Sequence, residues 1–230
     1  MPPRIAIDGP AGAGKSTLAR RLAHRLGYLY VDTGAMYRAL TYKALQLGVD
    51  LEHEGALTSL AESTNMELVP DAEGPRVILD GQDVTAHLRE PEINAGVSLV
   101  ARVPGVRARL TELQRRIAKK HPVVMDGRDI GTVVLPEAEH KFFVTASFEE
   151  RCRRRWREML DQGRAVSLDE VREQVALRDR LDSQRAVAPL AMAPDAVCID
   201  TTDLDADQVL ARVLAVIRGE TGATGAILDR

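Results

Sequence analysis

Short runs of consecutive apolar residues alternate along this chain with longer stretches in which apolar residues recur every three or four positions. The short runs, typical of strands buried on both faces, span residues 4–7, 28–31, 123–125, 141–144 and 196–199. The longer stretches predict helices at 33–47, 106–117, 147–160 and 205–217. Strands that alternate with helices in this way predict an α/β fold with a parallel central sheet.

Three regions depart from this alternation. Residues 66–70 and 76–80 are extended runs around a polar turn, which predicts a β-hairpin within an inserted subdomain at about 62–98. Residues 149–185 are helical in pattern, polar and rich in arginine. The segment 219–230 contains three glycines and no periodicity, which predicts a flexible tail. With 230 residues, the chain is expected to form one domain with an insertion.

The composition argues against several classes of protein. The net charge of −3 gives no general attraction to nucleic acid or membrane surfaces, and no apolar run approaches the ~20 residues of a transmembrane helix. The chain passes from Met1 directly into the first strand, so we expect no signal peptide and a cytoplasmic location. Cys152 and Cys198 lack the spacing of a metal site and are expected to be free thiols.

A glycine-rich motif joins the first strand to a helical pattern with Leu18, Leu22 and Leu26 one turn apart. Its residues are Gly9, Pro10, Ala11, Gly12, Ala13, Gly14, Lys15, Ser16 and Thr17. Between a strand and a helix, this spacing indicates a loop whose backbone N–H groups surround the phosphates of a nucleotide such as ATP. Lys15 is expected to contact the outer phosphates, and Ser16 is expected to bind Mg²⁺. The alternative is a glycine-rich surface turn.

Charged residues follow the apolar run at 123–125. Asp126 ends this strand and is expected to bind Mg²⁺ beside the glycine-rich loop, with a turn aspartate as the alternative. Arg128 is suited to gripping a phosphate, and Asp129 to accepting a hydrogen bond from the amino group of a base. An Arg–Asp pair in a surface turn would explain the same two residues without a ligand.

The second strand and the arginine-rich region supply further candidates. Arg38 is suited to a second phosphate clamp, while Thr33 is either a site residue or a helix N-cap. A basic run comprises Arg151, Arg153, Arg154, Arg155 and Arg157. Such a run is usually a solvated helix face; nucleic-acid binding and a lid over a transferring phosphoryl group are the alternatives. Spacing places Arg178, Asp182 and Arg185 on one helical face, where they could simply pair with one another.

No side chain in the sequence stands out as a general base for an alcohol acceptor. We find no clear Cys/His cluster and no Ser/His/Asp arrangement, and the five histidines are scattered. A phosphate monoester already carries about two negative charges near neutral pH, so it needs clamping more than deprotonation. Lysine, arginines and Mg²⁺ therefore favour phosphoryl transfer to a phosphate acceptor.

Four motifs, at 7–17, 32–38, 126–134 and 178–190, resemble those of the bacterial cytidylate kinase family. The resemblance runs from residue 5 to about 202; the first motif is common to many P-loop proteins, and the other three in this order are specific to the family. It implies a three-layer P-loop kinase fold and phosphorylation of CMP and dCMP by ATP with Mg²⁺. It also implies that the insert at 62–98 binds the monophosphate and that the region at 149–185 is a helical lid.

The resemblance further implies a role for each matching residue. Thr33, Arg107, Asp129 and Arg185 would contact the cytosine, and Ser98, Arg178 and Asp182 the sugar. Arg38 and Arg128 would clamp the acceptor phosphate, while Arg154 and Arg155 would belong to the lid over ATP. The catalytic cations would be Lys15, Arg128, Arg154 and Arg178. Since uracil lacks the amino group of cytosine, a carboxylate facing that position would discriminate between them.

Two other functions are compatible with the glycine-rich loop. Another small P-loop kinase would act on AMP, UMP or a metabolite alcohol, and the segments at 126–129 and 178–185 argue against it. A nucleotide-binding switch or nucleic-acid-handling ATPase would need no monophosphate; the arginine run favours it, and the net charge and the lack of interleaved aromatic residues argue against it. Nothing in the sequence requires more than a monomer.

Overall fold

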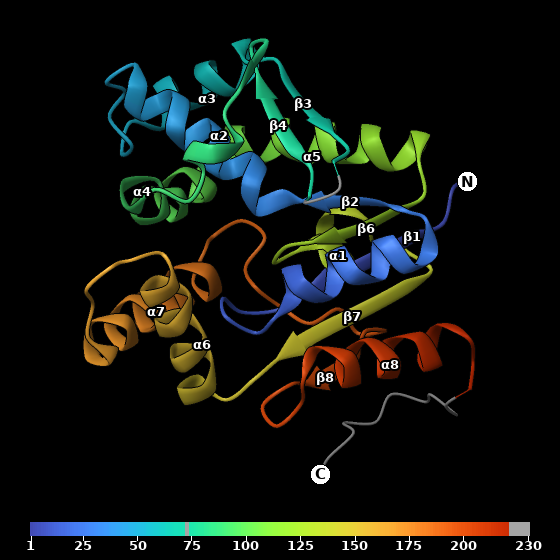
Figure 1. The fold of residues 1–230 in the computed structure, drawn as a ribbon. Helices are drawn as coiled ribbons and strands as arrows, with labels where there is room; N and C mark the ends of the chain where they lie inside the picture. The colour runs from blue at the N-terminus through green and yellow to red at the C-terminus, as the bar shows by residue number, and fades with distance from the viewer. Residues whose placement is uncertain (72–73, 221–230) are drawn as a thin grey trace.

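The computed structural model describes residues 1–71 and 74–220. At its centre is a five-stranded sheet of order β2–β6–β1–β7–β8, in which every pairing is parallel (Figure 1). The strands are β1 (Arg4–Asp8), β2 (Leu29–Asp32), β6 (Val123–Asp126), β7 (His140–Thr145) and β8 (Val197–Asp200). The five strands predicted from the apolar runs are therefore confirmed.

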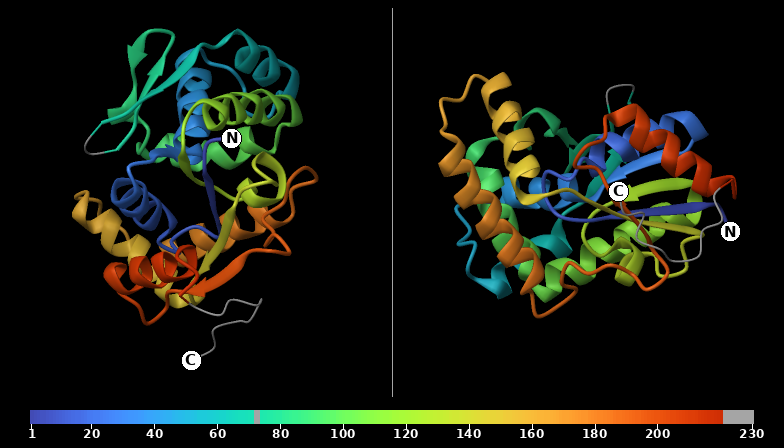
Figure 2. Two further views of the ribbon diagram at one scale, coloured as in Figure 1. Left: turned by 90° about the vertical axis from the view of Figure 1, so that its right-hand side faces the viewer. Right: turned by 90° about the horizontal axis from the view of Figure 1, so that it is seen from below.

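Helices cover both faces of this sheet, which gives three layers (Figure 2). Alternate residues of a strand point to opposite faces, so Ile5 and Ile7 join one apolar core and Ala6 joins the other. Helices α1 (Lys15–Leu26) and α8 (Ala206–Ile217) pack on the side of Ile5 and Ile7, and α2 (Thr33–Gln46) and α5 (Pro104–Lys120) pack on the side of Ala6. The predicted α/β fold with a parallel central sheet is confirmed.

A second sheet, which is antiparallel and three-stranded, lies beside α2. Its strands are β3 (Met66–Val69), β4 (Arg76–Leu79) and β5 (Gln82–Asp83), and the first two form the predicted hairpin. We did not predict β5, because it has two exposed polar residues and no apolar pattern. In sequence, α3 (Glu54–Ser63) precedes this sheet, and the 3₁₀ turn η1 (Thr85–His87) and α4 (Pro91–Arg102) follow it.

The arginine-rich region forms two helices, α6 (Phe148–Asp161) and α7 (Leu168–Ser183), which pack together around a small apolar cluster. The buried members of this cluster are Cys152, Met159, Val171 and Val175. Because α7 ends at Ser183, Arg185 lies beyond the helix, and the prediction that it shares a helical face with Arg178 and Asp182 is wrong. The chain turns there, and the N–H of Leu190 donates to the Asp182 carbonyl oxygen at 2.9 Å.

The remaining predictions concern the thiols and the end of the chain. Cys152 is buried, Cys198 is half-buried, and both are free thiols as expected. The predicted tail at 219–230 lies mostly outside the described residues, and α8 ends at Ile217. Across residues 1–71 and 74–220, we find no helix with the length and apolar character needed to cross a membrane.

Candidate functional site

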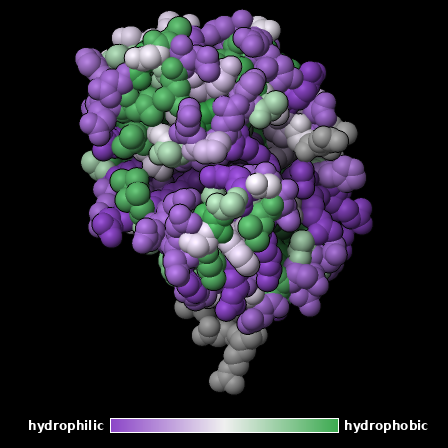
Figure 3. Space-filling model, turned by 60° about the vertical axis from the view of Figure 1, so that its left-hand side comes forward, coloured by the Kyte–Doolittle hydropathy of each residue, from purple (hydrophilic) through white to green (hydrophobic). Residues whose placement is uncertain are grey.

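The carboxyl ends of β1, β2 and β6 open into a polar cleft, seen in Figure 3 as a hydrophilic hollow between two parts of the molecule. Most of the predicted site residues line this cleft: Ala11, Gly12, Lys15, Ser16, Thr33, Arg38, Ser98, Arg107, Asp126, Arg128, Asp129, Arg178, Asp182 and Arg185. Residues of the glycine-rich loop that do not line it are Gly9, Pro10, Ala13, Gly14 and Thr17. The fold thus brings together side chains from distant segments, as parallel strands are expected to do at their carboxyl ends.

The glycine-rich loop lies so close to its neighbours that side chains would not fit at two positions. At Gly9 (φ 142°), a Cβ would come within 1.9 Å of the carbonyl oxygen of Val144 in β7. At Gly12 (φ 78°), a Cβ would come within 2.9 Å of the carbonyl oxygen of Arg151 in α6. Glycine is needed for both the positive φ and the close approach. The loop therefore stays at the N-terminus of α1, where backbone N–H groups attract anions.

Lys15 is the first residue of α1 and is buried. Its Nζ donates to the carbonyl oxygen of Pro10, within the loop itself, at 2.6 Å. Burial and the nearby Arg128 lower the pKa of Lys15 below its usual value. A phosphate in the loop would supply negative charge and so favour the protonated ammonium. Lys15 is therefore suited to contacting a bound phosphate.

Ser16 and Asp126 form the part of the site that suits a metal ion. The Ser16 hydroxyl donates to Oδ2 of Asp126 at 2.8 Å, and the Tyr30 hydroxyl donates to Oδ1 at 3.0 Å. Burial and the neighbouring Asp32 raise the pKa of Asp126 to about 6. The positive charge near this carboxylate therefore does not fully compensate its negative charge. A hydroxyl and an undercompensated carboxylate fit Mg²⁺, which prefers oxygen ligands.

The protein would supply only part of the coordination of such an ion. Over residues 1–71 and 74–220, no group of three or more His, Cys, Asp or Glu residues could hold a metal. Mg²⁺ usually retains several waters and binds through one or two carboxylates together with substrate phosphates. The donor set at Ser16 and Asp126 is consistent with that mode of binding.

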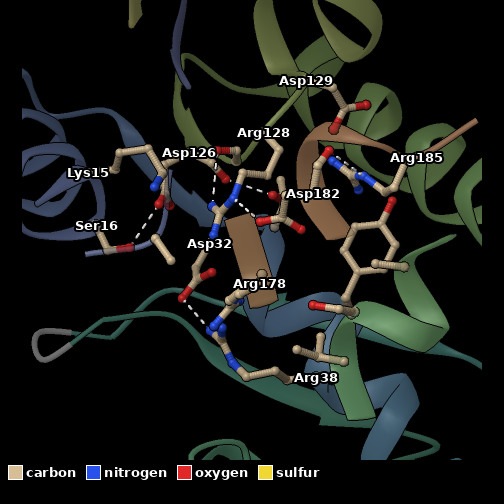
Figure 4. Close-up of a pocket in the computed structure, with 18 of the residues that line it drawn as sticks. Lys15, Ser16, Asp32, Arg38, Asp126, Arg128, Asp129, Arg178, Asp182 and Arg185 are labelled. Atoms are coloured by element: carbon tan, nitrogen blue, oxygen red, sulfur yellow. Dashed lines mark hydrogen bonds and ion pairs between the residues drawn. The ribbon is translucent and has the colours of Figure 1, made fainter. Parts of the chain in front are cut away.

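Three arginines bring their guanidinium groups close together in the cleft (Figure 4). Arg38 pairs with Asp32 at 3.0 Å, and Nε of Arg128 donates to Oδ2 of Asp182 at 2.7 Å. Burial and the nearby Arg128 lower the pKa of Arg178 to about 10. The Nε atoms of Arg38 and Arg178 are buried without a hydrogen-bond partner. Crowded cations with unused donors are suited to an anion with several oxygens, such as a phosphate.

Asp182 lies among these arginines. Burial alone would raise the pKa of Asp182, but Arg128 and Arg178 hold it below its usual value. The carboxylate therefore stays ionised and can accept hydrogen bonds from ligand hydroxyls. Ser98 lines the cleft from α4 and adds a hydroxyl of its own. Together these groups can bind a polyhydroxylated ligand such as a sugar.

A further cluster of polar side chains in the cleft lies near the ring of Tyr37. Nη2 of Arg107 donates to Oδ2 of Asp129 at 2.5 Å, and its Nη1 donates to the carbonyl oxygen of Ala101 at 3.1 Å. The guanidinium carbon of Arg107 lies 5.6 Å from the centroid of the Tyr37 ring. Nη2 of Arg185 is buried without a partner. Donors and a carboxylate acceptor beside an aromatic ring are suited to a heteroaromatic base.

The hydrogen bonds of Thr33 and Arg154 show how the structure places these two predicted residues. Asp32, rather than Thr33, is the N-cap of α2, because its side chain accepts from the N–H of Ala35 at 2.8 Å. Thr33 is the first helical residue, and its hydroxyl donates to the Asp126 carbonyl oxygen at 2.7 Å. Arg154 does not line the cleft; its Nη1 donates to the Thr201 hydroxyl at 2.8 Å.

Asp8 is a buried residue beside the site to which the sequence analysis gave no role. It ends β1, and its carboxylate accepts from the N–H groups of Ile130 at 2.8 Å and Gly131 at 2.7 Å. These two residues begin η2 (Ile130–Val134), a π-helical turn directly after Arg128 and Asp129. Burial raises the pKa of Asp8 to about 6 although these two bonds lower it. Asp8 therefore ties the turn to the strand that leads into the glycine-rich loop.

One signal in the sequence could have found two of the four missed residues. Asp8 and Asp32 each end a parallel strand, where ligands of open α/β sheets bind. Tyr30 and Tyr37 carry no such signal, because an aromatic residue near a strand or in a helix is ordinary core material. Their roles depend on tertiary contacts with Asp126 and Arg107.

Comparisons with known proteins agree with this geometry. Residues 5–219 match the family described as cytidylate kinase. A cytidylate kinase of Geobacillus kaustophilus (strain HTA426) is 53% identical over 218 residues, which cover 95% of this chain and 97% of the relative. One from Pelotomaculum thermopropionicum (strain DSM 13744 / JCM 10971 / SI) is 54% identical over 214 residues, covering 93% and 95%.

A solved structure shares the fold at low sequence identity. The uncharacterized protein from Eubacterium ventriosum ATCC 27560 has a TM-score of 0.53 and 13% identity, over 94% of this chain and 98% of that chain. This likeness supports the architecture alone. The match across residues 5–219 and the identity above 50% to curated relatives carry the assignment, and the chain belongs to the cytidylate kinase family.

Proposed function

We propose that this protein transfers the γ-phosphoryl group of ATP to the phosphate of CMP or dCMP. The observation that supports this most is the joining of two different sets of side chains in one cleft. One set, around Lys15 and Ser16, suits nucleotide phosphates, and the other, around Arg107, Asp129 and Arg128, suits a second phosphate with a base. A nucleotide switch or simple ATPase needs only the first set.

On the donor side, the loop N–H groups and Lys15 would hold the β- and γ-phosphates of ATP. Ser16 and Asp126 would bind Mg²⁺, with Tyr30 orienting the carboxylate through its hydrogen bond. When bound, Mg²⁺ supplies positive charge that neutralises the phosphate oxygens.

On the acceptor side, Arg38 and Arg128 would hold the phosphate of CMP in line with the γ-phosphorus. An oxygen of that phosphate bonds to the γ-phosphorus while the bond to the β–γ bridging oxygen breaks, which yields CDP and ADP. Lys15, Arg128 and Arg178 would spread the charge of the transferring group. Arg154, with Arg155, would act on ATP from the lid segment, because Nη1 of Arg154 lies 3.7 Å from where a Cβ on Gly14 of the loop would be.

Recognition of the nucleoside would use the remaining cleft residues. Thr33, Arg107 and Arg185 would contact the cytosine ring, and Asp129 would accept from its amino group. Ser98, Arg178 and Asp182 would contact the sugar. Asp129 has the geometry to serve both Arg107 and a base, because a carboxylate has two oxygens and Arg107 occupies Oδ2.

Two segments of the enzyme would move during the reaction. Residues 62–98 would close over the monophosphate and residues 149–185 over ATP, excluding water that would otherwise accept the phosphoryl group. We propose a cytoplasmic monomer that uses ATP, Mg²⁺ and CMP or dCMP, without a nucleic acid or membrane partner.

A panel of acceptors tests the proposed function. With ATP and Mg²⁺, ADP release should be at least about tenfold faster with CMP or dCMP than with UMP or AMP, because uracil and adenine leave Asp129 or the arginines unpaired. Release without an acceptor should be slow. Equal rates with all four monophosphates, or ADP release that no monophosphate stimulates, would contradict the proposal.

Asp8 gives a second prediction for this reaction. Asp8→Asn should lower kcat about tenfold, because an amide oxygen replaces only one of two carboxylate acceptors and the NH₂ group faces an N–H. Hydrogen exchange at the Ile130 and Gly131 amides should become faster. Asp200→Asn is the control, since Asp200 also ends a strand and accepts a backbone N–H, from Thr202 at 2.8 Å, but does not line the cleft. Unchanged kcat and exchange in Asp8→Asn would refute this role.

A further inference from the structure

Arg151 is a buried arginine of α6 that has no role in the proposed reaction, yet it joins three parts of the structure. Its Nη1 donates to the carbonyl oxygen of Ala11 in the glycine-rich loop at 3.2 Å. The same guanidinium forms a two-pronged pair with Asp179 of α7, at 3.1 Å to Oδ1 and 2.8 Å to Oδ2. Its Nε donates to the carbonyl oxygen of Ala146, at the end of β7, at 3.2 Å.

Burial and close packing hold Arg151 against the glycine-rich loop. Its side chain is 8% exposed, and its guanidinium carbon lies 5.6 Å from the centroid of the Phe148 ring. Its backbone lies directly against the loop, because a Cβ on Gly12 would come within 2.9 Å of its carbonyl oxygen. A displacement of the loop at Ala11 and Gly12 therefore has to move Arg151 or break its hydrogen bond.

Asp179 is placed so that it would pass such a displacement to the acceptor side. It precedes Asp182 by three residues and follows Arg178 directly on the same helix, α7. Arg178 and Asp182 line the cleft, whereas Asp179 and Arg151 do not. Because a helix moves as a nearly rigid unit, the position of Asp179 relative to the loop sets the positions of Arg178 and Asp182.

The Arg151–Asp179 pair is not needed simply to hold α6 and α7 together. The cluster of Cys152, Met159, Val171 and Val175 already joins the two helices. A second ion pair, Arg172–Glu149 at 2.7 Å, also joins them at the surface without touching the loop. Buried ion pairs contribute little net stability compared with apolar packing. What Arg151 adds is a fixed link between the loop and α7.

We propose that the Arg151–Asp179 pair couples the two nucleotide sites, so that a triphosphate in the loop aligns α7 for binding of the monophosphate. This inference rests on the proposed function. Phosphates bound by the loop fix the Ala11 carbonyl, which fixes Arg151 and, through Asp179, the side chains of Arg178 and Asp182. Arg151 and Asp179 are positioning residues, since neither touches a substrate. Coupling of this kind is reciprocal, so CMP should favour the triphosphate by the same factor.

Calorimetric titration of the full-length protein tests the coupling. The dissociation constant of CMP is measured with Mg²⁺ alone and with Mg²⁺ and a non-hydrolysable β,γ-imido analogue of ATP. In the wild type the analogue should tighten CMP binding about fivefold or more. In Asp179→Asn this ratio should fall towards one, while the affinity for CMP alone changes little because Asp179 lies outside the cleft. The reverse titration should give the same ratios.

Glu149→Gln is the matched control, because it removes an ion pair between the same two helices that does not reach the loop. This variant should keep the wild-type ratio. Arg151→Lys, which keeps the charge but loses the fork, provides a second test if Asp179→Asn is poorly folded. A wild-type ratio of one, an unchanged ratio in both coupling variants, or equal loss in Glu149→Gln would overturn the coupling. Failure of the wild type to bind CMP at all would overturn the proposed function as well.

Discussion

Replacing Arg128 by alanine is expected to lower kcat for CMP at least about a hundredfold, the range found when a charged group that stabilises a transferring phosphoryl group is removed. Arg128 lies between the two proposed phosphate sites: it lowers the pKa of Lys15 on one side and pairs with Asp182 on the other. Its loss removes a donor to the phosphate and also leaves Asp182 with one neutralising arginine fewer. The KM for ATP should change much less than kcat, because Arg128 does not belong to the loop.

The matched variant for this prediction is Arg128→Lys. Lysine keeps the charge and loses the planar fork, so its kcat should lie between those of the wild type and Arg128→Ala. Rates are measured by steady-state ADP release, and circular dichroism confirms that each variant is folded. Turnover of Arg128→Ala at the wild-type rate would remove Arg128 from the mechanism.

Replacing Lys15 by methionine is expected to lower kcat by about a thousandfold, because methionine fills a similar volume without the ammonium proposed to contact the outer phosphates. The structure provides a reason for a large effect. Lys15 is buried with its pKa lowered, and its Nζ has the Pro10 carbonyl as its hydrogen-bond acceptor. The ammonium is thus poorly compensated until a phosphate arrives, so its interaction with that phosphate should be strong. Single-turnover measurement of CDP formation isolates this step.

A second lysine serves as the control for this experiment. The side chain of Lys141 in β7 is also mostly buried, and its Nζ also donates to a proline carbonyl, that of Pro136 at 2.5 Å. It does not line the cleft. Lys141→Met should therefore keep kcat near the wild-type value even if stability falls. A comparable loss of kcat in the two variants would show that the effect of Lys15 is structural.

The strands and the glycine-rich loop could be predicted because their structural requirements are visible in the residue types themselves. All four residues of Val123–Asp126 are buried, so the strand appears in the sequence as an apolar run ending in a carboxylate. The loop is recognisable in the sequence by the spacing of its glycines, because only glycine allows its backbone to approach Val144 and Arg151. For elements of this kind, the residue types state the structural requirement directly.

Other features depend on contacts between distant residues, which no local pattern reveals. β6 lies between β2 and β1 although it is third of the three in sequence. Arg107 and Asp129, expected only as separate contacts to a base, are hydrogen-bonded across 22 residues. The end of α7 before Arg185 depends on a turn that helical spacing does not indicate. The sequence therefore predicted which residues gather at the cleft, but not how they pair.

Six cationic and four anionic side chains line the cleft, whereas the chain as a whole carries a net charge of −3. A long polyanion such as nucleic acid would meet the whole surface, where the net negative charge of the chain gives no general attraction. A small anion that reaches the cleft experiences the local positive excess, since low-dielectric walls focus the field there. This uneven distribution of charge is therefore expected to favour small phosphate compounds over long ones before any hydrogen bond to a base has formed.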